Sequence, residues 1–272
     1  MIVPRPQSGH FVGELPFVRL GDGSRTLVIF PALGDAVRNV TDLAWRLAWY
    51  YRSFADDHTV YLISRKRGLP KGYSTRQMAV DYAEVFERSI GGPADVVGLS
   101  MGGLIAQHFA ADFPQHVRRL VIGVAAHRLG AEGERMVRRW SNLAQQERWR
   151  EIHADNVELM YTGIRRSLYG FLVRHTSERL LPKPVNPSDY VVSMEACLDH
   201  DAANRLDDVR VPTLVVGGTQ DDLFPEALLR RTAQLIPEST LRLIEKTGHG
   251  AFHERKRVFD EAVKEFIGVG RL

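Results

Sequence analysis

Strand-like segments that alternate with helix-like segments limit the folds open to this chain. Between residues 26 and 125, β-rich runs and amphipathic stretches follow each other in turn, with strands expected at 26–30, 58–64, 94–99 and 118–125 and helices at 41–54, 74–90 and 102–113. Strands separated by helices predict parallel pairing, with helices on both faces of the sheet. Residues 13–25, with Gly21-Asp22-Gly23 as the turn, predict an antiparallel hairpin at the sheet edge.

The pattern changes in the second half of the chain. Residues 127–207 show helical periodicity without a strand, and the strand–helix rhythm then returns, with strands expected at 211–218 and 240–245 and helices at 225–236 and 252–267. We therefore predict an α/β fold, with a doubly wound, mostly parallel sheet and an inserted all-helical cap. The core domain is expected over 1–126 and 208–272, and the cap over 127–207.

Composition favours an ordinary globular protein. The 272 residues are 44% hydrophobic and 25% charged, with a formal net charge of +3. The short basic runs, among them Arg65-Lys66-Arg67, are expected to be solvated, and no long basic arm indicates nucleic-acid binding. The single cysteine, Cys197, excludes an intrachain disulfide and is expected to be a small buried residue. Without a signal-peptide pattern or an apolar membrane span, we expect a cytoplasmic protein.

A serine flanked by glycines follows the predicted strand at 94–99. The residues Gly98-Leu99-Ser100-Met101-Gly102 join this strand directly to a helix. Such a sharp reversal strains the serine backbone and needs small residues two before and two after it. Ser100 would then stand at the carboxyl edge of the sheet and at a helix N-terminus. This placement favours a nucleophile over a glycine-rich turn without chemistry.

A serine nucleophile needs a base and an acid that orients the base. After the strand at 211–218 the chain offers Asp221 and Asp222, and after the strand at 240–245 it offers His249 between two glycines. The order serine, aspartate, histidine is the one expected of a doubly wound hydrolase sheet.

The chain resembles α/β-hydrolase fold proteins with a helical cap, a serine-nucleophile, carboxylesterase-like group. The resemblance rests on Gly98-Leu99-Ser100-Met101-Gly102-Gly103, on Gly218-Thr219-Gln220-Asp221 ahead of Pro225, and on Gly248-His249. It implies Ser100, Asp221 and His249 as the catalytic triad, and it selects Asp221 over Asp222. A serine in place of an aspartate also argues against the epoxide-hydrolase and haloalkane-dehalogenase branches.

The resemblance further implies an oxyanion hole, formed by the N–H groups of Met101 and Leu33. Here the chain departs from the family, which commonly carries His-Gly where this sequence has Pro31-Ala32. Pro31 has no side-chain hydrogen bond with which to brace the loop, so we expect a working but less typical hole. A second departure is Arg65, which stands where related chains often have an acid; such a position usually serves structure or solubility.

Acyl chemistry fits this site best, with a carboxylic ester of a small apolar molecule as the expected substrate. The same triad supports carbon–carbon bond hydrolysis, acyl transfer and cofactor-free perhydrolysis, and a receptor with slow hydrolysis is a further alternative. Trp140, Tyr161 and Leu223 are candidate pocket residues, and the wider set of candidates comprises Trp149, Met160, Tyr169, Phe171 and Phe224.

No cofactor and no metal are expected. His253 lies four residues after His249, a spacing that can form a metal pair, but no third ligand of suitable spacing accompanies it. His108 is expected to be a packed or surface side chain, and His200 has no motif around it. A monomer and a homodimer are both compatible with the sequence.

Overall fold

An eight-stranded sheet forms the centre of the molecule in the computed structural model, which describes residues 3–268. The strands are β1 Gln7–His10, β2 Pro16–Leu20, β3 Arg25–Phe30, β4 His58–Ile63, β5 Ala94–Leu99, β6 Val117–Gly123, β7 Thr213–Gly218 and β8 Ser239–Ile244. They lie in the order β1-β2-β4-β3-β5-β6-β7-β8. The pairs formed by β1 with β2 and by β2 with β4 are antiparallel, and the remaining pairs are parallel.

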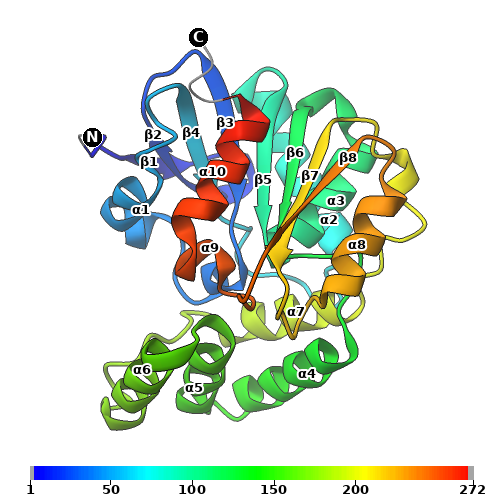
Figure 1. Ribbon diagram of the computed structural model, residues 1–272. Coiled ribbons are helices and arrows are strands. Elements are labelled where there is room, and N and C mark those ends of the chain that lie inside the picture. The colour runs from blue at the N-terminus through cyan, green and yellow to red at the C-terminus, as the bar shows by residue number, and fades with distance from the viewer. Residues whose placement is uncertain (1–2, 269–272) are drawn as a thin grey trace.

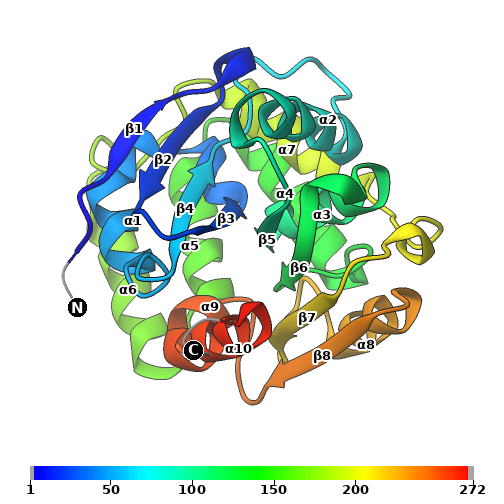
Figure 2. The ribbon, with the colours of Figure 1, turned by 90° about the horizontal axis from the view of Figure 1, so that it is seen from above.

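Helices cover both faces of this sheet (Figure 2). One face carries α2 Thr75–Val85, α3 Met101–Asp112 and α8 Glu226–Leu235. The other carries α1 Ala44–Tyr51, α9 Ala251–Glu254 and α10 Lys256–Ile267. Every residue of β5 and β7 is buried, as expected for strands covered on both sides. The predicted doubly wound, mostly parallel α/β fold is confirmed.

Local signals in the sequence place the start of α2 well. Ser74 Oγ accepts a hydrogen bond from Gln77 N, and Gln77 Oε1 accepts one from Ser74 N, which completes a capping box. The predicted helix at 74–90 continues after Val85 as one π-helical turn over Phe86–Ile90, and it ends at Gly91 with a φ of 77°.

The predicted hairpin over residues 13–25 is wrong. β2 pairs with β1 on one side and with β4 on the other, so β2 and β3 flank the same strand without pairing to each other. Stacking of Phe11 on Phe17, with ring centroids 4.1 Å apart, supports the β1–β2 pair. Gly21 and Gly23 approach the backbone of residues 55–58 closely. This turn therefore passes the N-terminal end of β4, and β3 then pairs with β4 on the side opposite β2.

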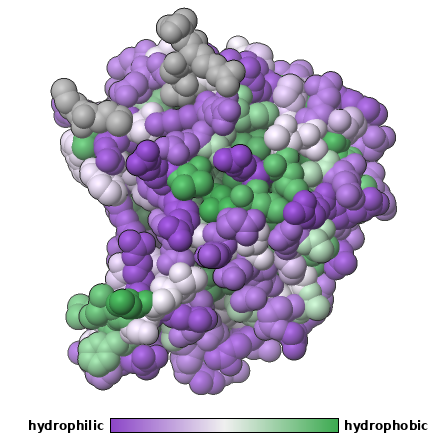
Figure 3. Space-filling view, viewed as in Figure 1, coloured by the Kyte–Doolittle hydropathy of each residue, from purple (hydrophilic) through white to green (hydrophobic). Residues whose placement is uncertain are grey.

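Four helices lie between β6 and β7, beyond the carboxyl ends of the strands (Figure 1). They are α4 Ala131–Gln145, α5 Trp149–Met160, α6 Gly163–His175 and α7 Pro187–Leu198. None of the described residues from 124 to 212 forms a strand, so the insertion is helical as predicted, while the domain boundaries at 126/127 and 207/208 stay predictions. On α6 the side chains of Ile164, Leu168 and Phe171 are exposed. Figure 3 shows an apolar patch at the lower left, where Figure 1 places α5 and α6.

Besides His58 and His249, three histidines among the described residues are buried: His108, His127 and His200. His200 Nδ1 lies 2.9 Å from Thr75 Oγ1, His127 Nδ1 lies 3.1 Å from Thr232 Oγ1, and the rings of His108 and His200 are 5.0 Å apart. Burial lowers the pKa of all three imidazoles below the ordinary value. Each is therefore neutral in the folded chain at a pH where the unfolded chain already binds a proton.

This difference in pKa predicts that acid destabilises the fold. Below about pH 6.5 the unfolded state binds more protons than the folded state, so the free energy of unfolding falls as the pH falls. Urea unfolding at pH 7.5 and at pH 5.5 measures the loss, and His200→Gln is expected to show a smaller pH dependence than the native chain. An unfolding free energy that is equal at the two pH values would contradict this prediction.

Candidate active site

The turn between β5 and α3 holds Ser100 in a strained conformation. Ser100 has φ 52° and ψ −117°, a backbone geometry that residues other than glycine rarely adopt. A Cβ atom on Gly98 would lie 2.4 Å from Gly102 O, and one on Gly102 would lie 2.1 Å from Phe30 O. Because these contacts are with backbone atoms, the two glycines are what allows the chain to turn so tightly around the serine.

We expect Gly102→Ala to destabilise the protein by about 3 kcal/mol, because the new methyl group overlaps a backbone oxygen that cannot rotate away. Gly92→Ala is the matched control: Gly92 has no heavy atom within 4 Å of an added Cβ and no positive φ. Thermal or urea unfolding of both variants measures the difference. Equal stability of the two variants would show that the turn at Ser100 tolerates a side chain.

Ser100, His249 and Asp221 form one hydrogen-bonded chain. His249 Nε2 lies 2.9 Å from Ser100 Oγ, and His249 Nδ1 lies 2.9 Å from Asp221 Oδ2. A carboxylate can only accept, so Nδ1 carries the proton, and the neutral ring leaves Nε2 free to accept from the serine hydroxyl. All three side chains are buried. The arrangement can move a proton from Ser100 to an imidazole that a carboxylate holds in place.

The loop after β7 brings Asp221, and not Asp222, to the histidine. Asp221 Oδ1 accepts hydrogen bonds from the N–H groups of Leu223 and Phe224, so the carboxylate is held from both sides, whereas Asp222 is exposed. On the histidine loop, an added Cβ at Gly250 would lie 1.8 Å from Met160 O, which explains why a glycine follows His249 where the cap meets the core.

Both residues predicted for the oxyanion hole lie beside the serine. Leu33 and Met101 line the same cavity as Ser100 and His249. Each is the first residue of a helical segment, Leu33 of the 3-10 turn Leu33–Ala36 and Met101 of α3, so neither N–H has an acceptor within its own segment. The positions suit two backbone donors, and their role in binding an oxyanion stays a prediction.

The prediction of a solvated basic run is wrong for Arg65. Its side chain is 2% exposed and lies against the loop of Pro31 and Ala32, with Nη1 donating to both carbonyl oxygens at 3.2 and 3.3 Å. Arg65 comes two residues after β4, and its burial depends on Asp35, an acid on another loop that lies 3.6 Å from its guanidinium.

A cavity of about 450 Å³ opens above Ser100, between the sheet edge and the cap. This volume is within the range of small-molecule sites, about 300–1,000 Å³. Among the predicted pocket residues, those that line it are Trp140, Met160, Tyr161, Leu223 and Phe224. Trp149 is buried elsewhere, while Tyr169 and Phe171 are exposed on α6, so these three do not form the pocket wall.

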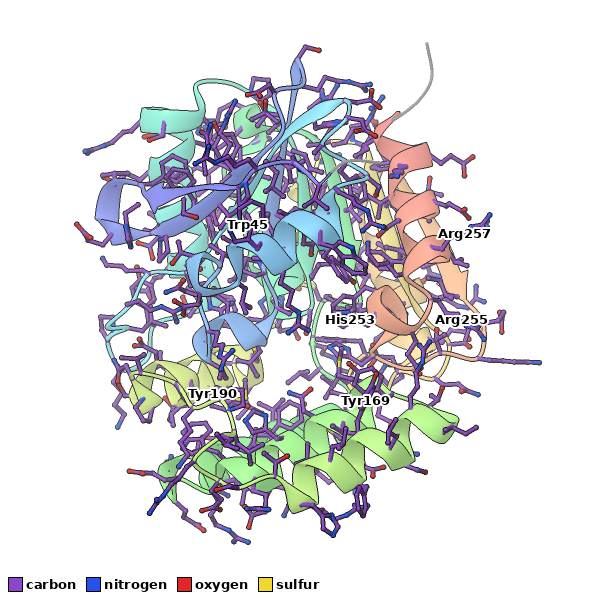
Figure 4. All side chains as sticks on the ribbon, turned by 90° about the vertical axis from the view of Figure 1, so that its left-hand side faces the viewer. Trp45, Tyr169, Tyr190, His253, Arg255 and Arg257 are labelled. Atoms are coloured by element: carbon purple, nitrogen blue, oxygen red, sulfur yellow. The ribbon has the colours of Figure 1, made fainter. Side chains whose placement is uncertain are left out.

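The cavity also contains residues that sequence reasoning missed. Arg46 and His253 line it from the core side, and Met194 and Cys197 line it from α7. Figure 4 shows His253 where the core faces the cap helices. Burial lowers the pKa of His253 to about 4, so this imidazole is neutral near pH 7. These side chains could have been assigned only from the way α1, α9 and α7 meet.

Metal binding finds no support in the arrangement of the described residues. Within residues 3–268, no group of three or more His, Cys, Asp or Glu side chains is placed to hold a metal ion. Both ring nitrogens of His249 already have partners in the chain from Ser100 to Asp221. The ring of His253 instead lies 5.3 Å from the ring of Tyr50.

The chain belongs to the alpha/beta hydrolase fold family, whose sequence model matches residues 25–256. It is 28% identical over 204 residues to a Bacillus subtilis (strain 168) protein provisionally named 2-succinyl-6-hydroxy-2,4-cyclohexadiene-1-carboxylate synthase, a match that covers 72% of this chain and 74% of that protein. A pimeloyl-[acyl-carrier protein] methyl ester esterase of Neisseria meningitidis is 26% identical over 197 residues, covering 69% of this chain and 74% of the esterase.

A solved structure agrees over almost the whole chain. The enol-lactonase from Burkholderia xenovorans LB400 superposes with a TM-score of 0.74, at 22% identity, and covers 96% of this chain and 100% of its own. At that identity the likeness concerns the fold alone. No helix among residues 3–268 is long and apolar enough to span a bilayer.

Proposed function

We propose that this protein is a serine hydrolase that cleaves carboxylic esters through an acyl-enzyme intermediate. The observation that carries the proposal is the hydrogen-bonded chain from Ser100 through His249 to Asp221, which opens into a cavity of about 450 Å³. Esterase-type relatives support the same reaction class. An assembled nucleophile and base argue for turnover rather than for a receptor that only binds its ligand.

In the proposed reaction Ser100 Oγ attacks the ester carbonyl carbon as its proton passes to His249 Nε2. The N–H groups of Leu33 and Met101 donate to the oxygen of the tetrahedral intermediate. Collapse breaks the bond to the alkoxide, which leaves with the proton from His249. Water then attacks the acyl group, His249 takes its proton, and collapse releases the carboxylic acid and restores the Ser100 hydroxyl. Asp221 accepts from Nδ1 throughout and stabilises the imidazolium.

The cavity wall indicates an apolar acyl or alkoxy group. Cap residues on the wall include Val137, Trp140, Val157 and Met194; Leu104 contributes from α3, and Leu129 from the segment between β6 and α4. A wall of this kind binds alkyl or aryl groups by removing them from water. Arg46 and His253 add polar groups to the core side of the same space.

Multiple-turnover hydrolysis of p-nitrophenyl esters, from acetate to decanoate, tests the proposal. We expect turnover with an optimum at an intermediate chain length, because the cavity is bounded by the cap. A folded protein that hydrolyses no member of the series would contradict carboxylic ester hydrolysis. Product analysis with an added alcohol, with hydrogen peroxide, or with a vinylogous diketone distinguishes ester hydrolysis from acyl transfer, perhydrolysis and carbon–carbon bond cleavage.

Val157→Phe is expected to shorten the acyl pocket. Val157 lines the cavity from α5 and is half-buried, so the larger ring occupies open space instead of a packed core. We predict that kcat/KM falls about tenfold or more for the octanoate ester and changes less than about twofold for the acetate ester.

Val80→Phe is the matched control for this prediction, because Val80 is exposed on α2 and does not line the cavity. It should leave both esters unaffected. A ratio of octanoate to acetate activity that is the same in native, Val157→Phe and Val80→Phe proteins would show that the cavity does not hold the acyl chain.

A further inference from the structure

A buried arginine lies directly behind the loop that carries Leu33. Arg65 follows β4 by two residues and is the bulkiest of the fully buried side chains in the described part of the chain. Burying a guanidinium is costly unless hydrogen bonds and a counter-charge compensate for the lost water. The contacts of Arg65 therefore show which groups compensate for its burial.

Three consecutive backbone carbonyls receive the Arg65 guanidinium. Nη1 donates to Pro31 O at 3.2 Å and to Ala32 O at 3.3 Å, and Nη2 lies 3.5 Å from Leu33 O. A planar fork of N–H donors can hold several carbonyls at once, which a lysine cannot do equally well. The loop has Pro31 where related chains commonly have a histidine, and the Arg65 side chain holds it through its carbonyl oxygens instead.

The contact between Arg65 and Ala32 O determines the direction of the Leu33 N–H, because both groups belong to one peptide unit. Ala32 C=O and Leu33 N–H belong to one peptide unit, which is planar and trans, so the two groups point in opposite directions. Arg65 holds the Ala32 oxygen on the buried side of the loop. The Leu33 N–H is therefore directed away from Arg65, and Leu33 lines the cavity that contains Ser100.

Asp35 supplies the counter-charge for Arg65. Its carboxylate lies 3.6 Å from Arg65 Nη2 and accepts from Arg65 N at 3.1 Å and from Ser64 Oγ at 2.5 Å. Arg67 also contacts Asp35, because its Nη2 donates to the backbone oxygen of Asp35 at 2.6 Å. No hydrogen bond joins Arg67 to the carbonyls of residues 31–33. Arg65 and Arg67 thus share one acid and differ in whether they hold the loop.

We propose that Arg65 is a positioning residue for the oxyanion hole, which fixes the Leu33 N–H toward Ser100 by holding the carbonyls of Pro31, Ala32 and Leu33. The inference rests on the proposed function, because the direction of this N–H affects catalysis only if Ser100 attacks a carbonyl. Ala32 O also accepts from Asp35 N at 3.1 Å, so without Arg65 this turn hydrogen bond alone holds the peptide between Ala32 and Leu33. The Leu33 N–H is then less firmly directed, and the transition state loses part of the stabilisation from this donor while the ground state of the substrate binds as before.

Arg65→Met and Arg67→Met provide the test, with an ester that the native protein hydrolyses. Arg65→Met is expected to lower kcat about tenfold to a hundredfold with KM changed less than about threefold, since the lost interaction belongs to the transition state. Arg67→Met keeps the three carbonyl contacts and should keep kcat within about threefold of native. Thermal midpoints of both variants show whether either one is poorly folded.

Inhibition separates a positioning role from a general loss of structure. An alkylboronic acid forms a tetrahedral adduct with a serine and places an oxygen in the oxyanion hole, whereas the matching carboxylate product does not need that adduct. For Arg65→Met we expect the boronate inhibition constant to rise about tenfold or more and the carboxylate constant to stay within about twofold. If Arg65→Met does not fold, Arg65→Lys retains the charge beside Asp35 and should show the same pattern to a smaller extent.

The outcomes distinguish this inference from the proposed function. A native protein that hydrolyses no ester and forms no boronate adduct contradicts the proposed function itself. An active native protein whose Arg65 variants keep the native kcat and boronate affinity overturns the inference and leaves the function standing. Equal losses of kcat, boronate affinity and carboxylate affinity in the Arg65 and Arg67 variants would also overturn it, since they would mark a structural role.

Discussion

Ser100→Ala is expected to lower kcat/KM for p-nitrophenyl esters by about 10⁴-fold or more, while the protein remains folded. The hydroxyl is the nucleophile of the proposed reaction, and the variant retains only the activity that binding and the oxyanion hole provide. The loss of one oxygen creates almost no cavity, and alanine has the same backbone preferences as serine at φ 52°. Stability should therefore change little, and steady-state kinetics with a thermal unfolding scan measures both effects.

Ser141→Ala is the matched control for this variant, because Ser141 is a buried serine on α4 that does not line the cavity. It should hydrolyse esters at close to the native rate. If Ser100→Ala retained activity within about tenfold of native, hydrolysis would have to come from another group, and the proposed mechanism would be wrong.

Asp221→Asn is expected to lower kcat about 10⁴-fold, the second large effect. An amide at this position can donate to His249 Nδ1, which favours the tautomer whose Nε2 carries a proton and cannot accept one from Ser100. Asp222→Asn changes the neighbouring exposed carboxylate and should leave kcat within about twofold of native. Kinetics of the pair decides between the two aspartates. A larger loss in Asp222→Asn than in Asp221→Asn would reassign the acid.

Much of the fold could be predicted because its signals are local. Runs such as residues 94–99, apolar except for Asp95 and followed directly by a helix, indicate buried parallel strands with little help from the rest of the chain. The β1–β2 pair could not be predicted in the same way. Pairing of β2 with β4 competes with a hairpin across Gly21-Asp22-Gly23, and that competition is decided by packing between segments about 40 residues apart.

The candidate site, too, could be predicted only where its residues depend on the order of the strands and helices. Ser100, Asp221 and His249 each follow a strand at the carboxyl edge of the sheet, so their approach could be predicted from element order. Arg65 required knowledge that Asp35, on another loop, would be buried beside it. Which aromatic cap residues reach the cavity depended on how α5 and α6 pack: Tyr161, at the end of α5, lines the cavity, whereas Phe171, on α6, is exposed.

Covalent labelling shows directly whether Ser100 is the nucleophile. The native protein is mixed with a dialkyl p-nitrophenyl phosphate, digested, and analysed by mass spectrometry, with Ser100→Ala treated in parallel. We expect one dialkylphosphoryl group per chain, located on Ser100, release of one equivalent of p-nitrophenol, and no adduct in the variant. An adduct on another residue, or a folded native protein that stays unlabelled under conditions that label a known serine esterase, would contradict Ser100 as the nucleophile.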